Sequence, residues 1–185
     1  GLKVLQPEKV KNNEEFMNEI KAMNPELIVV VAYGKILPQE FLDIPRYGCV
    51  NVHGSLLPKY RGAAPIQWSV INGDEVTGVT TMYMEKGLDT GDMLIKRELP
   101  RGKETTAGEY HDALAVLGGE VLLETLDALS KGELAPEKQD DSLSSYASQL
   151  SKAEGEINWN ETATAVYNKV RGLNPWPKAF SYLGG

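Results

Sequence analysis

The chain has 185 residues, of which 42% are hydrophobic and 24% charged, a composition typical of a globular domain and unlike that of disordered or fibrous proteins. Its formal net charge of −7 argues against general nucleic-acid binding, because phosphates must be neutralised by clustered Lys and Arg. A single cysteine excludes an intramolecular disulfide framework and indicates a reducing compartment, and the longest apolar run, residues 27–33, is too short to span a bilayer.

The first third of the chain alternates strand-like and helical patterns. Asn12 with Glu15 resembles a capping box, and the apolar residues that follow have helical spacing up to Pro25. The β-branched run at 27–33 predicts a strand that is covered on both faces. In chain order, the expected elements are a strand at 2–6, a helix between Asn12 and Pro25, a strand at 27–33, a helical turn at 38–42 and a strand at 48–52. This order favours a parallel sheet with helices on its faces.

The rest of the chain continues with helices and strands and then becomes polar. Thr106 with Glu109 forms a second capping box, which opens a long helix that Gly132 ends. The expected elements are a helix at 64–71, strands at 76–84 and 93–99, the helix that ends at Gly132, a polar surface excursion at 135–152 and a helix that Asn160 could cap. The Asn-Pro-Trp-Pro run at 174–177 stops this last helix and is typical of a domain junction.

Asn51, His53 and Asp89 form the constellation that carries chemistry. Asn51 and His53 are two residues apart, so both side chains project from one face of a strand, near the edge of the sheet where open α/β folds bind ligands. An amide, an imidazole and a carboxylate can move an acyl group onto an amine without a metal. Two alternatives stay open, because a histidine after a strand is often structural and an Asp between glycines is often a turn residue.

Other reactive side chains have plainer interpretations. Lys59, Tyr60 and Arg61 form a basic and aromatic cluster that is more typical of a solvated turn than of a phosphate site. His111 is expected to be structural or exposed on a helix, and Cys49 to be a small core residue of a buried strand. With two distant histidines and one cysteine the sequence offers no convincing metal cluster, and its paired glycines lack the spacing of a nucleotide loop.

The motifs resemble those of the folate-dependent formyltransferases. The resemblance rests on Asn-Val-His-Gly-Ser-Leu-Leu-Pro-Lys-Tyr-Arg-Gly at 51–62 and Gly-Leu-Asp-Thr-Gly-Asp at 87–92, and it covers essentially the whole chain. Segments similar to the branch that acts on methionyl-tRNA lie at 29–38, 61–67, 157–159 and 174–177. The resemblance implies an α/β, Rossmann-like fold with a mostly parallel sheet and flanking helices. It also implies that Asn51, His53 and Asp89 are catalytic.

The reaction and the co-substrate are implied by the same resemblance. A formyl group would pass from 10-formyltetrahydrofolate to the α-amine of initiator methionyl-tRNA, for translation initiation and without a metal. Asn51 would donate a hydrogen bond to the oxyanion, and His53, as an imidazolium, would help stabilise it and pass a proton to the leaving folate nitrogen. Asp89 would orient His53 and favour its charged form, or take the amine proton through a water. The segments that match the folate pocket of the family contain Lys35, Ile36, Leu37, Ser55, Leu56, Leu57, Pro58, Lys86, Gly87 and Leu88.

The family also has parts that these residues do not match, namely an N-terminal strand-helix-strand unit and a C-terminal β-barrel domain. We therefore expect an incomplete catalytic domain at 1–134, and at 135–185 a helical, turn-rich extension and linker toward the barrel. A truncated sheet would leave the strand at 27–33 with an unpaired edge, so we expect self-association. The expected location is the bacterial cytosol or an organelle matrix. Alternatives are a family member that uses an amino sugar, glycinamide ribonucleotide or water as acceptor, and an inactive fragment that binds folate or RNA.

Overall fold

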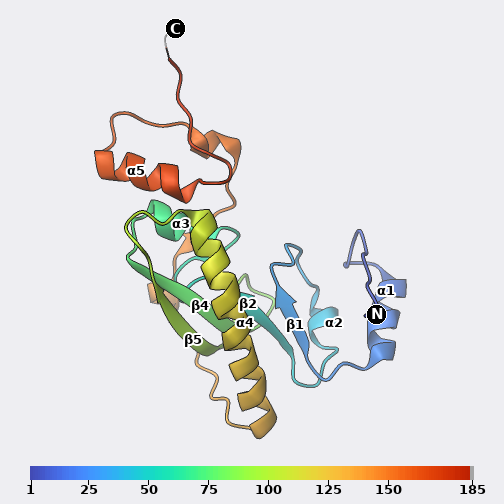
Figure 1. Cartoon of the computed structure of the whole chain (residues 1–185). Helices are drawn as coiled ribbons and strands as arrows, with labels where there is room; N and C mark the ends of the chain where they lie inside the picture. Colours follow the sequence, from blue (N-terminus) through green and yellow to red (C-terminus); the bar gives the residue numbers. More distant parts are fainter. Residues whose placement is uncertain (184–185) are drawn as a thin grey trace.

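A four-stranded mixed sheet forms the centre of the molecule (Figure 1). The computed structural model describes residues 1–183. In spatial order the strands are β1 (Ile28–Val31), β2 (Cys49–His53), β4 (Val76–Tyr83) and β5 (Met93–Pro100). The expected α/β class is confirmed, but in the described sheet only the β1–β2 pair is parallel, and β2–β4 and β4–β5 are antiparallel. The loop between β4 and β5 is too short for the crossover that parallel neighbours need.

The long helix α4 (Ala107–Lys131) covers one face of this sheet (Figure 1). The predicted capping box is confirmed: the Thr106 hydroxyl accepts from the Glu109 N–H, and the Glu109 carboxylate accepts from the Thr106 N–H. Gly132 ends the helix in the left-handed conformation, with φ of 69°, as its sequence position suggested.

Helix α4 lies close against strand β2 at a single glycine. A Cβ added at Gly118 would lie 3.2 Å from Cγ1 of Val52, so the absence of a side chain there sets the approach of helix and strand. Side chains alternate along a strand, and Asn51 and His53 therefore point to the opposite face of the sheet. That face is where the candidate site forms.

The N-terminal part packs a small core beside β1. It contains helix α1 (Glu14–Met23) and the short helix α2 (Gln39–Leu42), and the rings of Phe16 and Phe41 stack with their centroids 6.2 Å apart. The side chain of Asn13 accepts from the Phe16 N–H and caps α1, so this helix begins one residue later than the sequence suggested.

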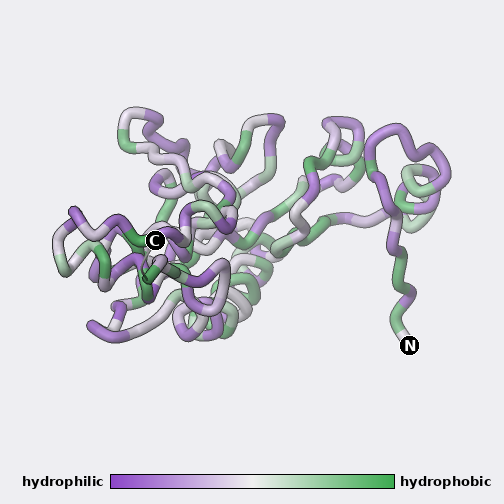
Figure 2. The backbone as a smooth tube through the Cα atoms, turned by 90° about the horizontal axis from the view of Figure 1, so that it is seen from above, coloured by the Kyte–Doolittle hydropathy of each residue, from purple (hydrophilic) through white to green (hydrophobic). Residues whose placement is uncertain are grey.

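Two expectations for the N-terminal part are wrong. Residues 2–6 form no strand; Leu2 is 96% exposed, and the first residues extend away from the rest of the chain (Figure 2). Strand β1 is not covered on both faces, because Val29 is 39% exposed and Val31 57%. Within residues 1–183 β1 pairs only with β2, so its outer edge has no partner strand in the described chain.

Two further helices, α3 (Pro65–Ile71) and α5 (Ala163–Gly172), pack on each other toward the C-terminal end of the chain (Figure 1). Helix α5 is capped by Thr162, whose hydroxyl accepts from the Ala165 N–H, and not by Asn160 as expected. The reason is local, since the backbone and side-chain amides of Asn160 both donate to the Asn158 side chain in the preceding turn.

The segment after α4, expected as a polar surface excursion, runs along the loop that follows β2. The remaining elements are the strands β3 (Arg61–Gly62) and β6 (Tyr146–Ala147), and the 3-10 helices η1 (Asp141–Leu143) and η2 (Lys152–Gly155). Strands β3 and β6 pair in parallel, which ties the excursion to the β2 side of the molecule. Most of its side chains are exposed, yet its backbone is bonded to the site described next.

Candidate active site

His53 is the last residue of β2 and is buried, with 5% of its surface exposed. Asn51 lies on the same strand face two residues earlier, half-buried, and stands in register with Val30 of β1 and Met82 of β4. Within residues 1–183 the Asn51 side-chain amide has no hydrogen-bond partner, so it is free to donate to a ligand. The strand thus presents an amide and an imidazole side by side.

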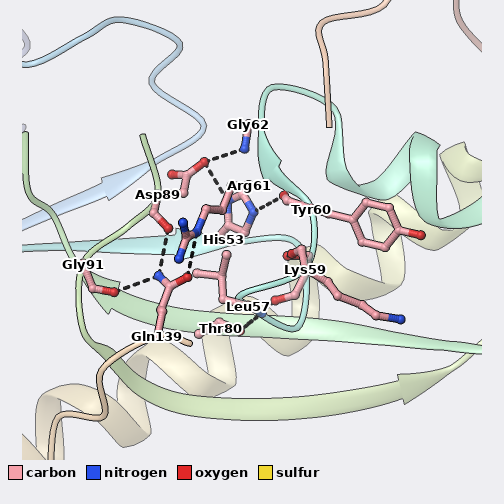
Figure 3. Close-up of polar contacts among 11 residues, drawn as sticks. His53, Leu57, Lys59, Tyr60, Arg61, Gly62, Thr80, Asp89, Gly91 and Gln139 are labelled. Atoms are coloured by element: carbon pink, nitrogen blue, oxygen red, sulfur yellow. Dashed lines mark hydrogen bonds and ion pairs between the residues drawn. The ribbon is translucent and has the colours of Figure 1, made fainter. Parts of the chain in front are cut away.

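The two ring nitrogens of His53 face two different oxygens (Figure 3). Nε2 lies 2.8 Å from the backbone carbonyl of Tyr60, and because a carbonyl can only accept, Nε2 carries a hydrogen. Nδ1 faces Asp89, with 3.7 Å between Nδ1 and Oδ2. Both ring nitrogens therefore point at oxygen acceptors, which fix the orientation of the ring.

Asp89 reaches His53 from the loop between β4 and β5. Its carboxylate Oδ2 also accepts a hydrogen bond of 2.8 Å from the Gly62 N–H, and its side chain is only 15% exposed. The loop is tight: Asp89 itself has a φ of 51°, and a Cβ added at Gly91 would lie 1.9 Å from the Tyr83 carbonyl oxygen. The structure therefore brings His53 and Asp89 together from positions 36 residues apart in the chain, as their numbers in the sequence give.

The loop after His53, which includes four of the residues expected to bind folate, is held rigidly. Ser55 is buried, its hydroxyl donates to the Lys59 carbonyl at 2.6 Å, and its own carbonyl accepts from Thr80 at 2.7 Å. Leu57 is also buried, and its N–H donates to the Thr80 hydroxyl at 3.1 Å. The side chains of Ser55 and Leu57 thus lie in the protein interior, whereas those of Leu56 and Pro58 are half-buried.

The other two segments expected to bind folate are more open. Lys35 donates from Nζ to the carbonyls of Pro7 and Glu8, at 2.8 Å each, and Ile36 is 88% exposed. Leu37 is buried and lines, with β1, a hollow of about 210 Å³. Neither this hollow nor a second one of about 540 Å³ at residues 102–109 is lined by the residues of the His53 site. On the third segment, Lys86, Gly87 and Leu88 are all exposed.

The Lys59-Tyr60-Arg61 cluster is not the solvated turn that the sequence suggested, apart from the exposed Lys59. Tyr60 is buried; its hydroxyl donates to Asp74 at 2.9 Å and accepts from Asn72 at 3.1 Å. Burial raises the pKa of Tyr60 to about 12. The Tyr60 side chain therefore anchors the turn whose carbonyl holds His53.

Sequence reasoning missed Gln139 and Ser145. The Gln139 amide donates to the carbonyls of Asp89 and Gly91 (Figure 3). The Ser145 hydroxyl accepts from the Tyr60 N–H at 2.9 Å. Both residues lie in a polar stretch without periodicity, so no local pattern marks them.

The other reactive residues are placed as expected. His111 is exposed on α4 beside Asp112, and Cys49 is buried in β2. Burial, with a smaller effect of the nearby Asp43 charge, raises the pKa of the Cys49 thiol to about 11. In residues 1–183 no three His, Cys, Asp or Glu side chains gather as a metal site would require. None of the helices in this range has the length and apolar character needed to cross a bilayer.

Solved structures with a similar fold support the arrangement of the sheet and helices. A sugar N-formyltransferase from Shewanella has a TM-score of 0.77 at 23% identity, covering 94% of this chain and 70% of its own. HypX from Aquifex aeolicus in complex with tetrahydrofolic acid has a TM-score of 0.76 at 21% identity, covering 89% of this chain and 28% of its own.

Sequence comparisons identify the family. The chain is 57% identical over all its residues to a methionyl-tRNA formyltransferase of Caldanaerobacter subterraneus, and 58% identical to one of Acetivibrio thermocellus. It spans 60% and 59% of the lengths of these relatives. The family described as formyl transferase matches residues 2–126, and the formyl transferase C-terminal domain matches residues 149–185. The chain therefore belongs to the formyl transferase family.

Proposed function

We propose that the chain is the catalytic part of an enzyme that transfers a formyl group from 10-formyltetrahydrofolate to the α-amine of methionyl-tRNA. The observation that carries the proposal is the placement of His53 between a carboxylate and a carbonyl, with the free Asn51 amide on the same strand face. The names of the relatives that are 57% and 58% identical support the choice of acceptor.

Each of the three side chains has a distinct role in this reaction. The amine attacks the formyl carbon, and the carbonyl oxygen becomes negative as the tetrahedral intermediate forms. Asn51 donates a hydrogen bond to that oxygen, an interaction whose loss typically raises the barrier by about 3–4 kcal/mol. His53 supplies the proton on Nδ1 to the folate nitrogen when the carbon–nitrogen bond breaks and the carbonyl re-forms. The proton that the attacking amine loses passes through a water to Asp89 and then back to Nδ1, so that no proton is gained or lost overall. Asp89 stabilises the imidazolium and holds the ring in place.

The folate co-substrate is proposed to lie against the rigid loop after His53. Its neighbours would be the backbone of Ser55–Pro58, the segment Lys35–Leu37 and the segment Lys86–Leu88, which flank β2 from two sides. Folate ligands in related structures agree with this proposal: HypX binds tetrahydrofolic acid, and an N-formyltransferase from Helicobacter canadensis, 25% identical with a TM-score of 0.63 over 66% of this chain and 46% of its own, binds folinic acid.

Initiator methionyl-tRNA is the proposed partner, and translation initiation in the bacterial cytosol or an organelle matrix is the proposed setting. The net charge of −7 predicts that these 185 residues alone bind tRNA weakly, with a shallow salt dependence. The division into a catalytic domain at 1–134 and an extension at 135–185 stays a prediction. Limited proteolysis tests it, because a true boundary would be cleaved near residue 134 and leave two stable pieces.

The function is tested by assaying the chain with 10-formyltetrahydrofolate and four acceptors: methionyl-tRNA, a nucleotide-linked amino sugar, glycinamide ribonucleotide and water. The same assay is run on the chain joined to the flanking segments of the Caldanaerobacter relative, of which the chain spans 60%. Formylation of methionyl-tRNA alone supports the proposal. Preferential formylation of either small amine, or release of formate only, would replace it with the corresponding alternative.

A further inference from the structure

A polar strap, residues 137–147, runs across the outside of the His53 site and contacts it from both sides. At one end the backbone of Glu137 exchanges two hydrogen bonds with Met93, at 2.8 and 2.9 Å, at the start of β5. At the other end the strap pairs with β3, where the Arg61 N–H donates to the Ser145 carbonyl at 2.9 Å. The strap therefore bridges the strand that follows the Asp89 loop and the loop that follows His53.

Gln139 makes the central contact of this strap. Its Nε2 donates to the carbonyls of Asp89 and Gly91, at 2.8 Å each, and its Oε1 accepts from Nε of Arg61 at 2.9 Å (Figure 3). Both amide hydrogens and one oxygen lone pair are thus used, which is nearly the full capacity of a Gln side chain. The second arm of Arg61 is held by Asp141 on the same strap, at 2.8 Å.

The residues that Gln139 joins are those that place the two partners of His53. Gln139 binds the backbone carbonyl of Asp89, and the Asp89 carboxylate faces Nδ1 of His53. Gln139 also binds the side chain of Arg61, the residue after Tyr60, whose carbonyl contacts Nε2 of His53. The same two loops are linked a second time by the Gly62 N–H, which donates to the Asp89 carboxylate. A shift of the Asp89 loop would therefore change both the Gly62 bond and the distance from the carboxylate to His53.

We infer that Gln139 is a positioning residue for the His53–Asp89 pair, fixing the Asp89 loop against the Arg61 turn. The inference rests on the proposed function for its kinetic consequence, because the pair matters for turnover only if it serves formyl transfer. Without the Gln139 amide, only the Gly62 N–H bond holds the Asp89 carboxylate toward the imidazole. Misplacement of a catalytic group lowers turnover more than it weakens substrate binding.

The variant that tests this is Gln139→Met, which keeps the length of the side chain and removes all its hydrogen bonds. Gln149→Met is the matched control, since Gln149 is exposed and lies just beyond the strap. The first readout is amide exchange in strand β3. The Gly62 N–H is protected by the Asp89 carboxylate, whereas the neighbouring N–H groups of Arg61 and Ala63 are protected by the backbone of residues 145 and 147.

If Gln139 positions the pair, Gln139→Met raises the exchange rate of the Gly62 amide by at least ~10-fold and leaves those of Arg61 and Ala63 near their original values. It also lowers kcat by at least ~10-fold with little change in KM for folate. Equal acceleration of all three amides would show that Gln139 merely holds the strap, and an unchanged Gly62 amide would show that it holds nothing; either result overturns the inference.

A second variant covers the case in which Gln139→Met does not fold. Gln139→Glu keeps an oxygen that accepts from Arg61, removes the donors to Asp89 and Gly91 and places a negative charge against their carbonyls, so the same selective effect on Gly62 is expected. Amide exchange is measured without substrates. A selective Gly62 response in a chain that formylates nothing even when joined to the flanking segments of the relative would refute the proposed function. Normal formylation with an unchanged Gly62 amide would refute the role of Gln139 alone.

Discussion

Replacing Tyr60 by Phe should separate the two tasks of this residue, because the backbone carbonyl holds His53 while the side-chain hydroxyl holds the turn. The hydroxyl is buried and bonded to both Asp74 and Asn72. Its removal leaves these two groups without their shared partner, which typically costs about 1–3 kcal/mol of unfolding free energy. Turnover should change little, since the carbonyl that accepts from His53 Nε2 remains in place.

The pH dependence of this loss follows from the raised pKa of Tyr60. Burial raises that pKa from 10.0 to about 12, so the folded state binds the phenolic proton more tightly than the unfolded state does. The contribution of the protonated Tyr60 phenol to the free energy of unfolding is therefore fully present below pH 10 and disappears as the pH rises toward 12. At pH 11 the two pKa values predict that the free energy of unfolding of the wild type is about 1.4 kcal/mol lower than below pH 10. The Phe variant has no phenol at this position and lacks this decrease.

The measurement is urea unfolding of the wild type and of Tyr60→Phe at pH 8 and pH 11, with Tyr146→Phe as the control because Tyr146 is 67% exposed. The stability gap between wild type and Tyr60→Phe should shrink by about 1.4 kcal/mol at the higher pH. A gap that does not depend on pH would refute the role assigned to the phenol. A large loss of turnover in Tyr60→Phe would refute the separation of side-chain and backbone tasks.

Three further predictions concern catalysis, the thiol and the free strand edge. His53→Asn should lower turnover by at least ~100-fold with little change in folate affinity, and near-normal turnover would remove His53 from the mechanism. Cys49 should resist iodoacetamide in the folded chain at pH 8, because it is buried and its pKa is about 11; mass spectrometry of intact and urea-unfolded protein checks this. The chain should self-associate through the outer edge of β1, and light scattering should show that Val31→Lys weakens association whereas Val116→Lys on α4 does not; a wild type that stays monomeric at every concentration contradicts this.

Features set by residues within one turn of each other could be predicted from the sequence. The capping box of Thr106 and Glu109, the helix end at Gly132 and the shared strand face of Asn51 and His53 follow from local hydrogen bonding and strand alternation. The pairing of His53 with Asp89 was suggested by chemistry rather than by spacing. The family resemblance, which rests on whole motifs, led to the prediction that the two residues act together in catalysis.

The tertiary structure decided the direction of most strand pairs and the surroundings of His53. Two of these features join residues far apart in the chain: the antiparallel β2–β4 pair and the hydrogen bond from Gln139 to the Asp89 carbonyl. The exposure of Val29 and Val31 on β1 likewise depends on which distant segments pack against that strand. Two of the bonds that fix the site end on backbone groups, the Tyr60 carbonyl and the Gly62 N–H. Almost every residue carries the same backbone donor and acceptor, so the sequence has no signal for which of them will face His53 or Asp89. Only the packing of the loops selects them.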